Sequence, residues 1–167
     1  MDAGRRSRLV TWADPAALRE AGRTMTRLEL IQAMIDGRLP RPPMGELMGY
    51  WPVEAVPGRV VYAGEPGEQH YNTIGTVHGG FAATLLDTVM GAVVQTMLEP
   101  GWMHTTLELK VNLVRAITKD TGPVRAIATT IHVGRRTALA EARLVDAEDR
   151  LYAHGSSTCL VIAPKAS

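Results

Sequence analysis

Apolar and polar positions along the chain predict a short helical region at the start. Residues 28–35 carry apolar side chains at helical spacing, and Thr24 is a candidate N-cap, so we expect a helix over residues 27–36 that ends at Gly37. The run LPRPPMG then ends this helix, because proline cannot continue it. Residues 46–50 predict one further helical turn.

From residue 51 onward the pattern is that of strands, interrupted by one long helix. Residues 51–56 and 59–64 flank a Pro-Gly turn and predict a hairpin. Residues 78–98 are almost wholly apolar and predict a helix that opens at His-Gly-Gly. Further strands are expected over residues 105–117, 124–133, 137–146 and 151–162, joined by tight connections into an antiparallel meander. This order predicts an α+β fold.

The long helix is apolar except for one stripe, about 100° wide on a helical wheel. The stripe consists of small and polar residues, namely Gly80, Thr84, Asp87, Thr88, Gly91 and Gln95. We therefore expect an antiparallel sheet to wrap most of the helix while the stripe faces a site or a partner subunit. A membrane span is disfavoured, because a carboxylate in its centre would be costly in lipid.

Composition and charge exclude several classes of protein. The chain has 167 residues, of which 46% are hydrophobic, and this suffices for one self-sufficient core. A net charge of +1 offers no general attraction to nucleic acid or an anionic membrane. The single cysteine, Cys159, allows no intrachain disulfide. The N-terminal residues show no signal-peptide pattern, so we expect a cytoplasmic protein. We expect a tail or arm over residues 1–25 and a single domain over residues 26–167.

One motif lies between the predicted hairpin and the long helix. The string NTIGTVHGG at residues 72–80, followed by Asp87, resembles the signature of hotdog-fold acyl-CoA thioesterases of the phenylacetate-degradation (PaaI-like) type. Residues 106–113 and 134–136 also resemble segments of that family. The resemblance implies a hotdog fold, in which an antiparallel sheet wraps one long central helix, here with an N-terminal helical extension. It also implies a homo-oligomer, either a dimer or a dimer of dimers (homotetramer).

Gly79 is the candidate oxyanion donor. At the first turn of a helix its backbone N–H has no intrahelical partner, and the helix end carries a partial positive charge. Such a donor polarises a thioester carbonyl and stabilises the negative charge of the tetrahedral intermediate. The absence of a side chain lets a substrate approach closely. A simple turn before a helix explains the two glycines equally well.

Asp87 is the candidate catalytic carboxylate. An ionisable group on the most apolar helix of the chain is costly unless it is paired or functional. A structural ion pair, or a hydrogen bond to threonine, is the alternative explanation. The resemblance implies a nucleophile on the thioester carbon or a general base for water, and the sequence does not separate these roles.

The spacing of these two residues predicts a shared site. Eight residues of helix place Asp87 about 12 Å along the axis from Gly79, whereas both must lie about 3 Å from one reacting centre. One helix cannot supply both groups. We therefore expect Asp87 of one protomer to act with Gly79 of another in a symmetric dimer.

Supporting roles follow from the resemblance, each with a structural alternative. Asn72 would orient the thioester or the water, and its alternative is a turn residue. His78 would cap the helix or steady the loop. Thr106, or Thr105 if the loop is one residue longer, would place a hydroxyl near the water, although both could be ordinary strand threonines.

Contacts to coenzyme A are expected at Gly80, Arg135 and Arg136. The two arginines could pair with its phosphates, or they could form a solvated hairpin tip. The other histidines show no metal-ligand spacing and are expected to be polar or surface residues, namely His70, His104, His132 and His154. We expect no metal and no cofactor other than coenzyme A as part of the substrate.

The sequence thus predicts an enzyme that hydrolyses acyl-CoA to coenzyme A and a carboxylic acid. The alternative is a hotdog module that binds acyl-CoA without hydrolysing it, as a sensor or a pathway carrier. Asp87 argues against this alternative, because binding an anionic ligand needs no carboxylate. The identity of the acyl group stays open.

Overall fold

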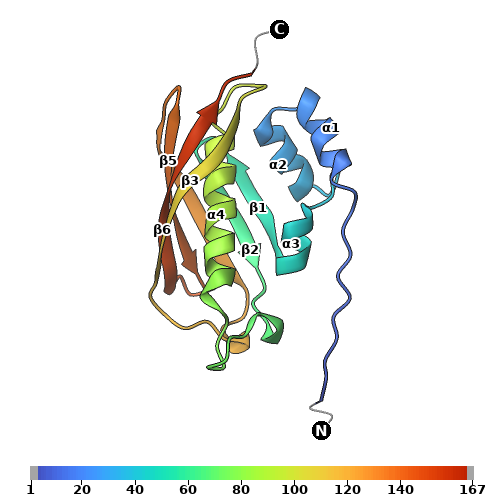
Figure 1. Ribbon diagram of the computed structural model, residues 1–167, viewed down its shortest axis with the longest axis vertical. Coiled ribbons are helices and arrows are strands. Elements are labelled where there is room, and N and C mark those ends of the chain that lie inside the picture. Colours follow the sequence, from blue (N-terminus) through green and yellow to red (C-terminus); the bar gives the residue numbers. More distant parts are fainter. Residues whose placement is uncertain (1–3, 165–167) are drawn as a thin grey trace.

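The computed structural model describes residues 4–164. One antiparallel sheet curves around the long helix α4 (Gly79–Gln95), as Figure 1 shows. Three shorter helices lie on the side of α4 away from β5 and β6, namely α1 (Ala16–Thr24), α2 (Arg27–Ile35) and α3 (Pro43–Met48). The hotdog architecture expected from the sequence is therefore confirmed, including its N-terminal helical extension.

Over residues 4–164 the sheet has six strands in the order β1-β2-β4-β5-β6-β3, and every neighbouring pair is antiparallel. Their bounds are β1 (Tyr50–Val56), β2 (Arg59–Gly64), β3 (Met103–Leu113), β4 (Val124–Val133), β5 (Thr137–Val145) and β6 (Leu151–Ile162). The expected meander is wrong at one connection, because β3 pairs with β6 and not with β4. The turn residues at 119–123 indicate a change of direction, but they carry no information on which strand becomes the neighbour.

The core lies between α4 and the concave face of the sheet. Leu85, Leu86, Val89 and Val93 of α4 are wholly buried. They face small side chains on the central strands, which are Ala126, Ala128, Ala138 and Ala140. These alanines allow the helix to approach the sheet closely, and so the apolar circumference of α4 is covered while the polar stripe is left outside.

The N-terminal region differs from the sequence prediction in two respects. The N-cap of α2 is Thr26 and not Thr24, because the Thr26 hydroxyl accepts a hydrogen bond from the Glu29 amide at 3.2 Å and the Glu29 carboxylate accepts one from the Thr26 amide at 2.7 Å. This reciprocal capping box fixes the helix start. Thr24 belongs instead to α1, a helix that the sequence analysis did not expect within residues 1–25.

Candidate active site

The polar stripe of α4 is half-buried except at Gly91, which is buried like most of the helix. Two of its threonines bond to their own helix, since the Thr84 and Thr88 hydroxyls donate to the carbonyls of Gly80 and Thr84, each at 2.8 Å. The Tyr50 hydroxyl lies 3.0 Å from the Thr88 hydroxyl. Burial raises the pKa of Tyr50, the Thr88 hydrogen bond lowers it in part, and the charge of Asp87 raises it again. Tyr50 is therefore protonated at neutral pH.

Asp87 lies at the centre of the stripe and faces β3. Its carboxylate accepts a hydrogen bond from the Thr106 hydroxyl at 3.0 Å. Thr105, the neighbour on the same strand, is exposed, so the structure places Thr106 beside the carboxylate. Asp87 is half-buried and not enclosed in the core, which makes its burial less costly than the apolar helix suggested. It borders a cavity of about 610 Å³.

His104 is a second polar side chain of this cavity, and the sequence analysis did not select it. Its ring packs on Gly91, where an added Cβ would lie 2.9 Å from Nε2. Its Nδ1 is buried without a hydrogen-bond partner among the described residues. Burial lowers the pKa of His104, the nearby Asp87 raises it, and Arg27 lowers it. Strand alternation could have indicated this histidine, because residues 104 and 106 lie on one face.

Gly79 lies at the N-terminal end of α4, beside a different cavity. His78 is the N-cap, and its Nδ1 accepts a hydrogen bond from the Gly80 amide at 2.8 Å. The Gly79 amide donates no hydrogen bond to another residue of the described chain. It therefore offers a donor at the positive end of the helix. This cap requires glycine at residue 80, because a Cβ there would lie 2.8 Å from Nδ1 of His78.

Asn72 lines the same cavity as Gly79, which measures about 230 Å³. Its amide nitrogen donates to the Thr76 hydroxyl at 3.0 Å, and its amide oxygen accepts from the amides of Ile74 and Thr76 at 3.0 and 3.2 Å. Both ends of the side chain are thus engaged within their own loop. In this structure Asn72 shapes the loop before α4, which is the turn role that the sequence left open.

The structure keeps these groups in separate places within one chain. The cavity beside Asp87 and the cavity beside Gly79 have no lining residue in common. Arg135 and Arg136 lie in the exposed turn between β4 and β5, and Arg135 lines a third cavity of about 210 Å³ with Trp102. The arginines are therefore not brought to either glycine or aspartate, and their contact with coenzyme A stays a prediction.

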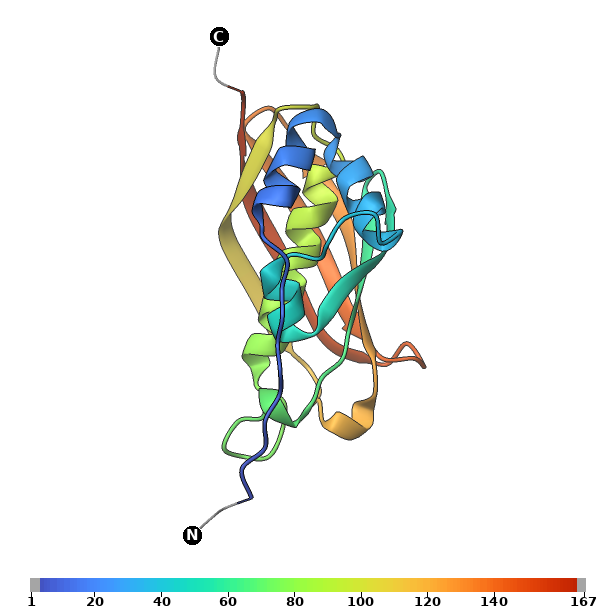
Figure 2. The ribbon, with the colours of Figure 1, turned by 90° about the vertical axis from the view of Figure 1, so that its right-hand side faces the viewer.

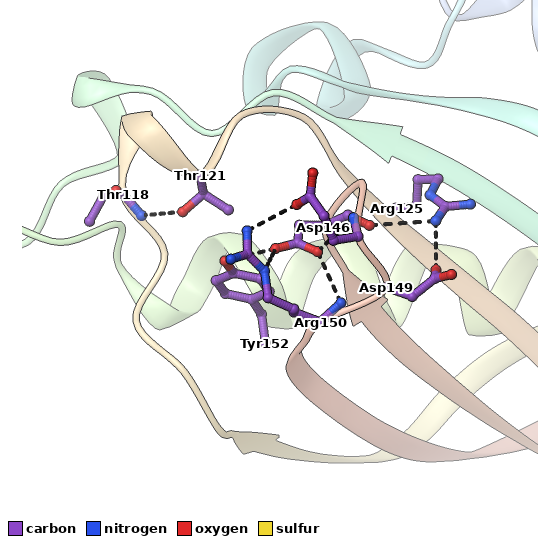
Figure 3. A network of polar contacts seen from close by, with 8 residues as sticks. Thr118, Thr121, Arg125, Asp146, Asp149, Arg150 and Tyr152 are labelled. Atoms are coloured by element: carbon purple, nitrogen blue, oxygen red, sulfur yellow. Dashed lines mark hydrogen bonds and ion pairs between the residues drawn. The ribbon is translucent and has the colours of Figure 1, made fainter.

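A fully buried carboxylate occurs elsewhere, at Asp146, which the sequence analysis did not select. Its carboxylate accepts hydrogen bonds from the amides of Glu148 (3.1 Å) and Arg150 (2.9 Å), from Arg150 Nε (2.6 Å) and from the Tyr152 hydroxyl (3.0 Å). Figure 3 shows Asp146 together with Arg150 and Tyr152. Burial by itself would raise the pKa of Asp146, but these hydrogen bonds lower it overall. This carboxylate stabilises the turn between β5 and β6.

The described residues, 4–164, hold neither a metal cluster nor a membrane-spanning helix. No group of three or more histidine, cysteine, aspartate or glutamate side chains there is placed to hold a metal ion. None of the helices in the same range is long and apolar enough to cross a membrane.

A sheet wrapped around one helix, with a carboxylate on the helix's outer stripe and a glycine amide at its start, is the arrangement of a hotdog fold. Residues 74–153 match the family model described as "Thioesterase superfamily". The chain belongs to this superfamily and is a thioester hydrolase.

Individual relatives agree with this assignment. The chain is 29% identical over 122 residues to the putative esterase ComA2 of Bacillus subtilis, covering 70% of this chain and 92% of that protein. It is 38% identical over 66 residues to acyl-coenzyme A thioesterase 13 of Homo sapiens, covering 40% of this chain and 45% of that protein. A mutant of the phenylacetic acid degradation protein PaaI from Thermus thermophilus is 28% identical, with a TM-score of 0.64, covering 71% of this chain and 98% of that one.

Proposed function

We propose that the protein hydrolyses acyl-CoA thioesters at a site shared between two copies of the chain. Asp87 of one protomer and the Gly79 amide of the other would act on the same carbonyl. Coenzyme A as the thiol is supported by the similarity to an acyl-coenzyme A thioesterase. The products would be coenzyme A and a carboxylic acid.

The separation of Asp87 and Gly79 carries this proposal. They line different cavities of one chain and lie about 12 Å apart along α4. A second copy related by a twofold axis can bring its Gly79 to the first copy's Asp87. Within one protomer, the Asp87 carboxylate and the Gly79 amide are too far apart to act on the same carbonyl.

The edge strand β3 offers the surface on which two copies would meet. It runs for 11 residues at the end of the sheet, and no strand of the described residues lies on its outer side. Leu107 and Leu113 on it are 61% and 59% exposed. A long, apolar edge strand is prone to pair with another chain. Antiparallel pairing of two β3 strands would continue the sheet and place the two α4 helices in opposite directions.

The chemistry follows from the groups in place. The Gly79 amide would hold the carbonyl oxygen and stabilise the oxyanion. As a general base, Asp87 would take a proton from water, the oxygen would add to the carbonyl carbon, and the departing thiolate would accept that proton. As a nucleophile, Asp87 would add to the carbonyl carbon and expel the coenzyme A thiolate, which leaves a mixed anhydride. Water would then open the anhydride, releasing the carboxylic acid, restoring the Asp87 carboxylate and supplying the proton that the thiolate takes up. In both routes Thr106 holds the carboxylate in place through its hydrogen bond.

Release of free thiol from a panel of acyl-CoAs tests the proposed reaction. We expect turnover by the native protein and its loss in Asp87→Ala with an unchanged oligomeric state. Tight acyl-CoA binding without any thiol release would instead identify the chain as a binding module.

Subunit mixing tests the shared site. Proline fits the first position of a helix but has no N–H, so Gly79→Pro removes the donor. Because a Cβ at residue 79 would lie 2.5 Å from Leu113 Cδ1, the change is made together with Leu113→Ala, and Gly79→Ala/Leu113→Ala, which keeps the N–H, is the matched control. Mixed with Asp87→Ala, the proline variant should recover about a quarter of native activity, because half of the dimers hold one intact site. Confirmed mixed dimers without activity would refute a shared site.

A further inference from the structure

We propose that the cavity beside Asp87 receives the acyl group and selects one that carries a terminal carboxylate, recognised by Arg27. This inference rests on the proposed function and adds the class of substrate. Three observations support it: the cavity has apolar walls, the Arg27 guanidinium has no ion-pair partner among the described residues, and arginines outnumber carboxylates around the cavity.

The N-terminal helices form one wall of this cavity. Figure 2 shows α1 and α2 in front of the C-terminal half of α4. Their apolar side chains line the cavity, namely Leu18, Leu30, Ile31 and Met34, opposite Gly91 and Ala92 of α4. The cavity follows α4 from Asp87 to Gln95, about 12 Å, which accommodates an extended acyl chain of roughly six carbons, about 6 Å long, with a polar contact of about 3 Å at each end. A cavity with apolar walls and polar groups placed among them is typical of a small-molecule site.

Arg27 is the half-buried cation of this wall. Its guanidinium packs against α1 at Gly22, where an added Cβ would lie 2.6 Å from Nη1. It makes no ion pair or side-chain hydrogen bond with any residue in the described range. The acid nearest in sequence, Glu29, is engaged by the amide and the hydroxyl of Thr26 at 2.7 and 2.9 Å. Arg27 therefore lacks a counter-ion where it faces the cavity.

The position of Arg27 is electrostatically unfavourable without an anion. It is the first residue of α2, where the helix dipole disfavours a positive charge. A half-buried guanidinium also loses solvation that only a hydrogen-bonded anion replaces well. A planar carboxylate can accept two hydrogen bonds from a guanidinium, so a ligand carboxylate is a suitable partner for Arg27.

The charges around the cavity favour an anionic ligand. Among the described residues that line it there are three arginines, Arg19, Arg23 and Arg27, and one carboxylate, that of Asp87. Arg23 pairs with Glu20 at 3.2 Å, which leaves Arg19 and Arg27.

His104 adds a hydrogen-bonding group one turn of α4 beyond Asp87, beside Gly91. A proton on the buried Nδ1 of His104 would have no hydrogen-bond acceptor, so the tautomer protonated on Nε2 is favoured. In that tautomer the Nε2–H can donate a hydrogen bond to the ligand. The thioester end would thus meet Asp87, and the carboxylate end would meet Arg27.

A pair of matched substrates tests the inference. Adipyl-CoA and hexanoyl-CoA have six-carbon acyl chains that differ by the terminal carboxylate. We expect the native protein to prefer adipyl-CoA by about tenfold or more in kcat/KM. Arg27→Met should bring the ratio close to one, and Arg27→Lys should keep part of it. The control is Arg38→Met, which removes an exposed arginine paired with Asp36 at 2.9 Å and should leave the ratio unchanged.

The result that overturns the inference is distinct from failure of the proposed function. An equal or greater kcat/KM for hexanoyl-CoA in the native protein, or an unchanged preference in Arg27→Met, would refute the carboxylate-selective pocket. If no thiol is released from these two substrates or from any other acyl-CoA of the panel, the proposed function fails, and binding decides the inference. Calorimetry on Asp87→Asn and on Asp87→Asn/Arg27→Met then compares both CoA esters, and tighter binding of adipyl-CoA that depends on Arg27 is the result expected.

Discussion

Two aspartates of this molecule, Asp87 and Asp146, occupy opposite kinds of environment. Asp146 is wholly buried and accepts four hydrogen bonds, including two from Arg150. Asp87 is half-buried and accepts one within the described chain, from Thr106. The first has no capacity left for a ligand, whereas the second keeps most of its lone pairs available beside a cavity.

The difference shows why burial alone does not identify a catalytic carboxylate. A buried carboxylate that is fully hydrogen-bonded stabilises the fold and is held in one geometry. A carboxylate that is held by one hydrogen bond and left open on its other side can exchange protons or attack a carbon. Substitutions at Asp87 should therefore affect activity, and substitutions at Asp146 should affect stability.

The largest effect on activity is expected at Asp87. Asp87→Asn keeps the size of the side chain and its hydrogen bond with Thr106 but removes the base or nucleophile. We expect kcat/KM for thiol release to fall about 10³-fold or more, with no loss of thermal stability. Thermal unfolding by circular dichroism is the control, and a variant that unfolds at a clearly lower temperature would place Asp87 with Asp146 as a structural residue.

The largest effect on stability is expected at Asp146. Asp146→Asn replaces one acceptor oxygen by a donor, which cannot accept from Arg150 Nε or from the Tyr152 hydroxyl. The midpoint of thermal unfolding should fall by several degrees, while the protein that stays folded keeps its kcat. A stable variant with reduced kcat would contradict the structural role.

The native protein and Asp146→Asn together also test the pH dependence of stability. The pKa of Asp146 is lowered by folding from its usual 3.8, so its ionised form stabilises the fold above that value. This contribution is lost as the pH falls through the lower, folded pKa. Native protein should therefore lose stability below about pH 4, and Asp146→Asn should show a flatter profile there. Identical acid profiles, measured by urea unfolding, would contradict this assignment.

A smaller effect is expected at the hydrogen bond that holds Asp87. Thr106→Val keeps the shape of the side chain but removes the donor to the carboxylate. Because a hydrogen bond to a charged group contributes about 1.5 kcal/mol, kcat/KM should fall about tenfold. The matched control is Thr105→Val on the exposed face of β3, where no change is expected. Equal losses in the two variants would show that the strand, and not the hydroxyl, matters.

The smallest effect is expected at the rim of the Asp146 network. Glu148 and Arg150 form an exposed ion pair at 3.0 Å. Glu148→Gln should change the free energy of unfolding by less than about 0.5 kcal/mol, because water and salt screen such pairs. The Glu148 amide, which bonds to Asp146, is retained in this variant. A loss comparable to that of Asp146→Asn, measured by the same urea titration, would show that the exposed ion pair contributes as much to stability as the buried carboxylate.

Local patterns in the sequence predict most of the strands. The strands at 124–133 and 151–162 occupy the predicted residues, and the hairpin at 51–64 was predicted with its turn. Alternation and turn residues act over a few positions, and so they can be read without the fold. The partner of β3 could not be read in this way, because its pairing with β6 joins residues about 50 positions apart.

Helix α1 was missed for a related reason. Only Leu18 and Ala21 of its residues pack against the core, and a helix of nine residues is marginal by itself. Its stability comes from packing on α2, which a periodicity search over one segment does not detect. The capping box of α2 was present in the sequence as Thr26 and Glu29, and the spacing of three residues could have indicated it.

The sequence by itself determined the long helix, its polar stripe and the spacing of Asp87 from Gly79, because these depend on helical geometry alone. The tertiary structure decided that Thr106 holds Asp87, that Asn72 shapes its own loop, and that Arg27 and His104 border the cavity of Asp87. These side chains come from different elements. Their neighbours are set by packing across the whole fold, and no local pattern in the sequence encodes such contacts.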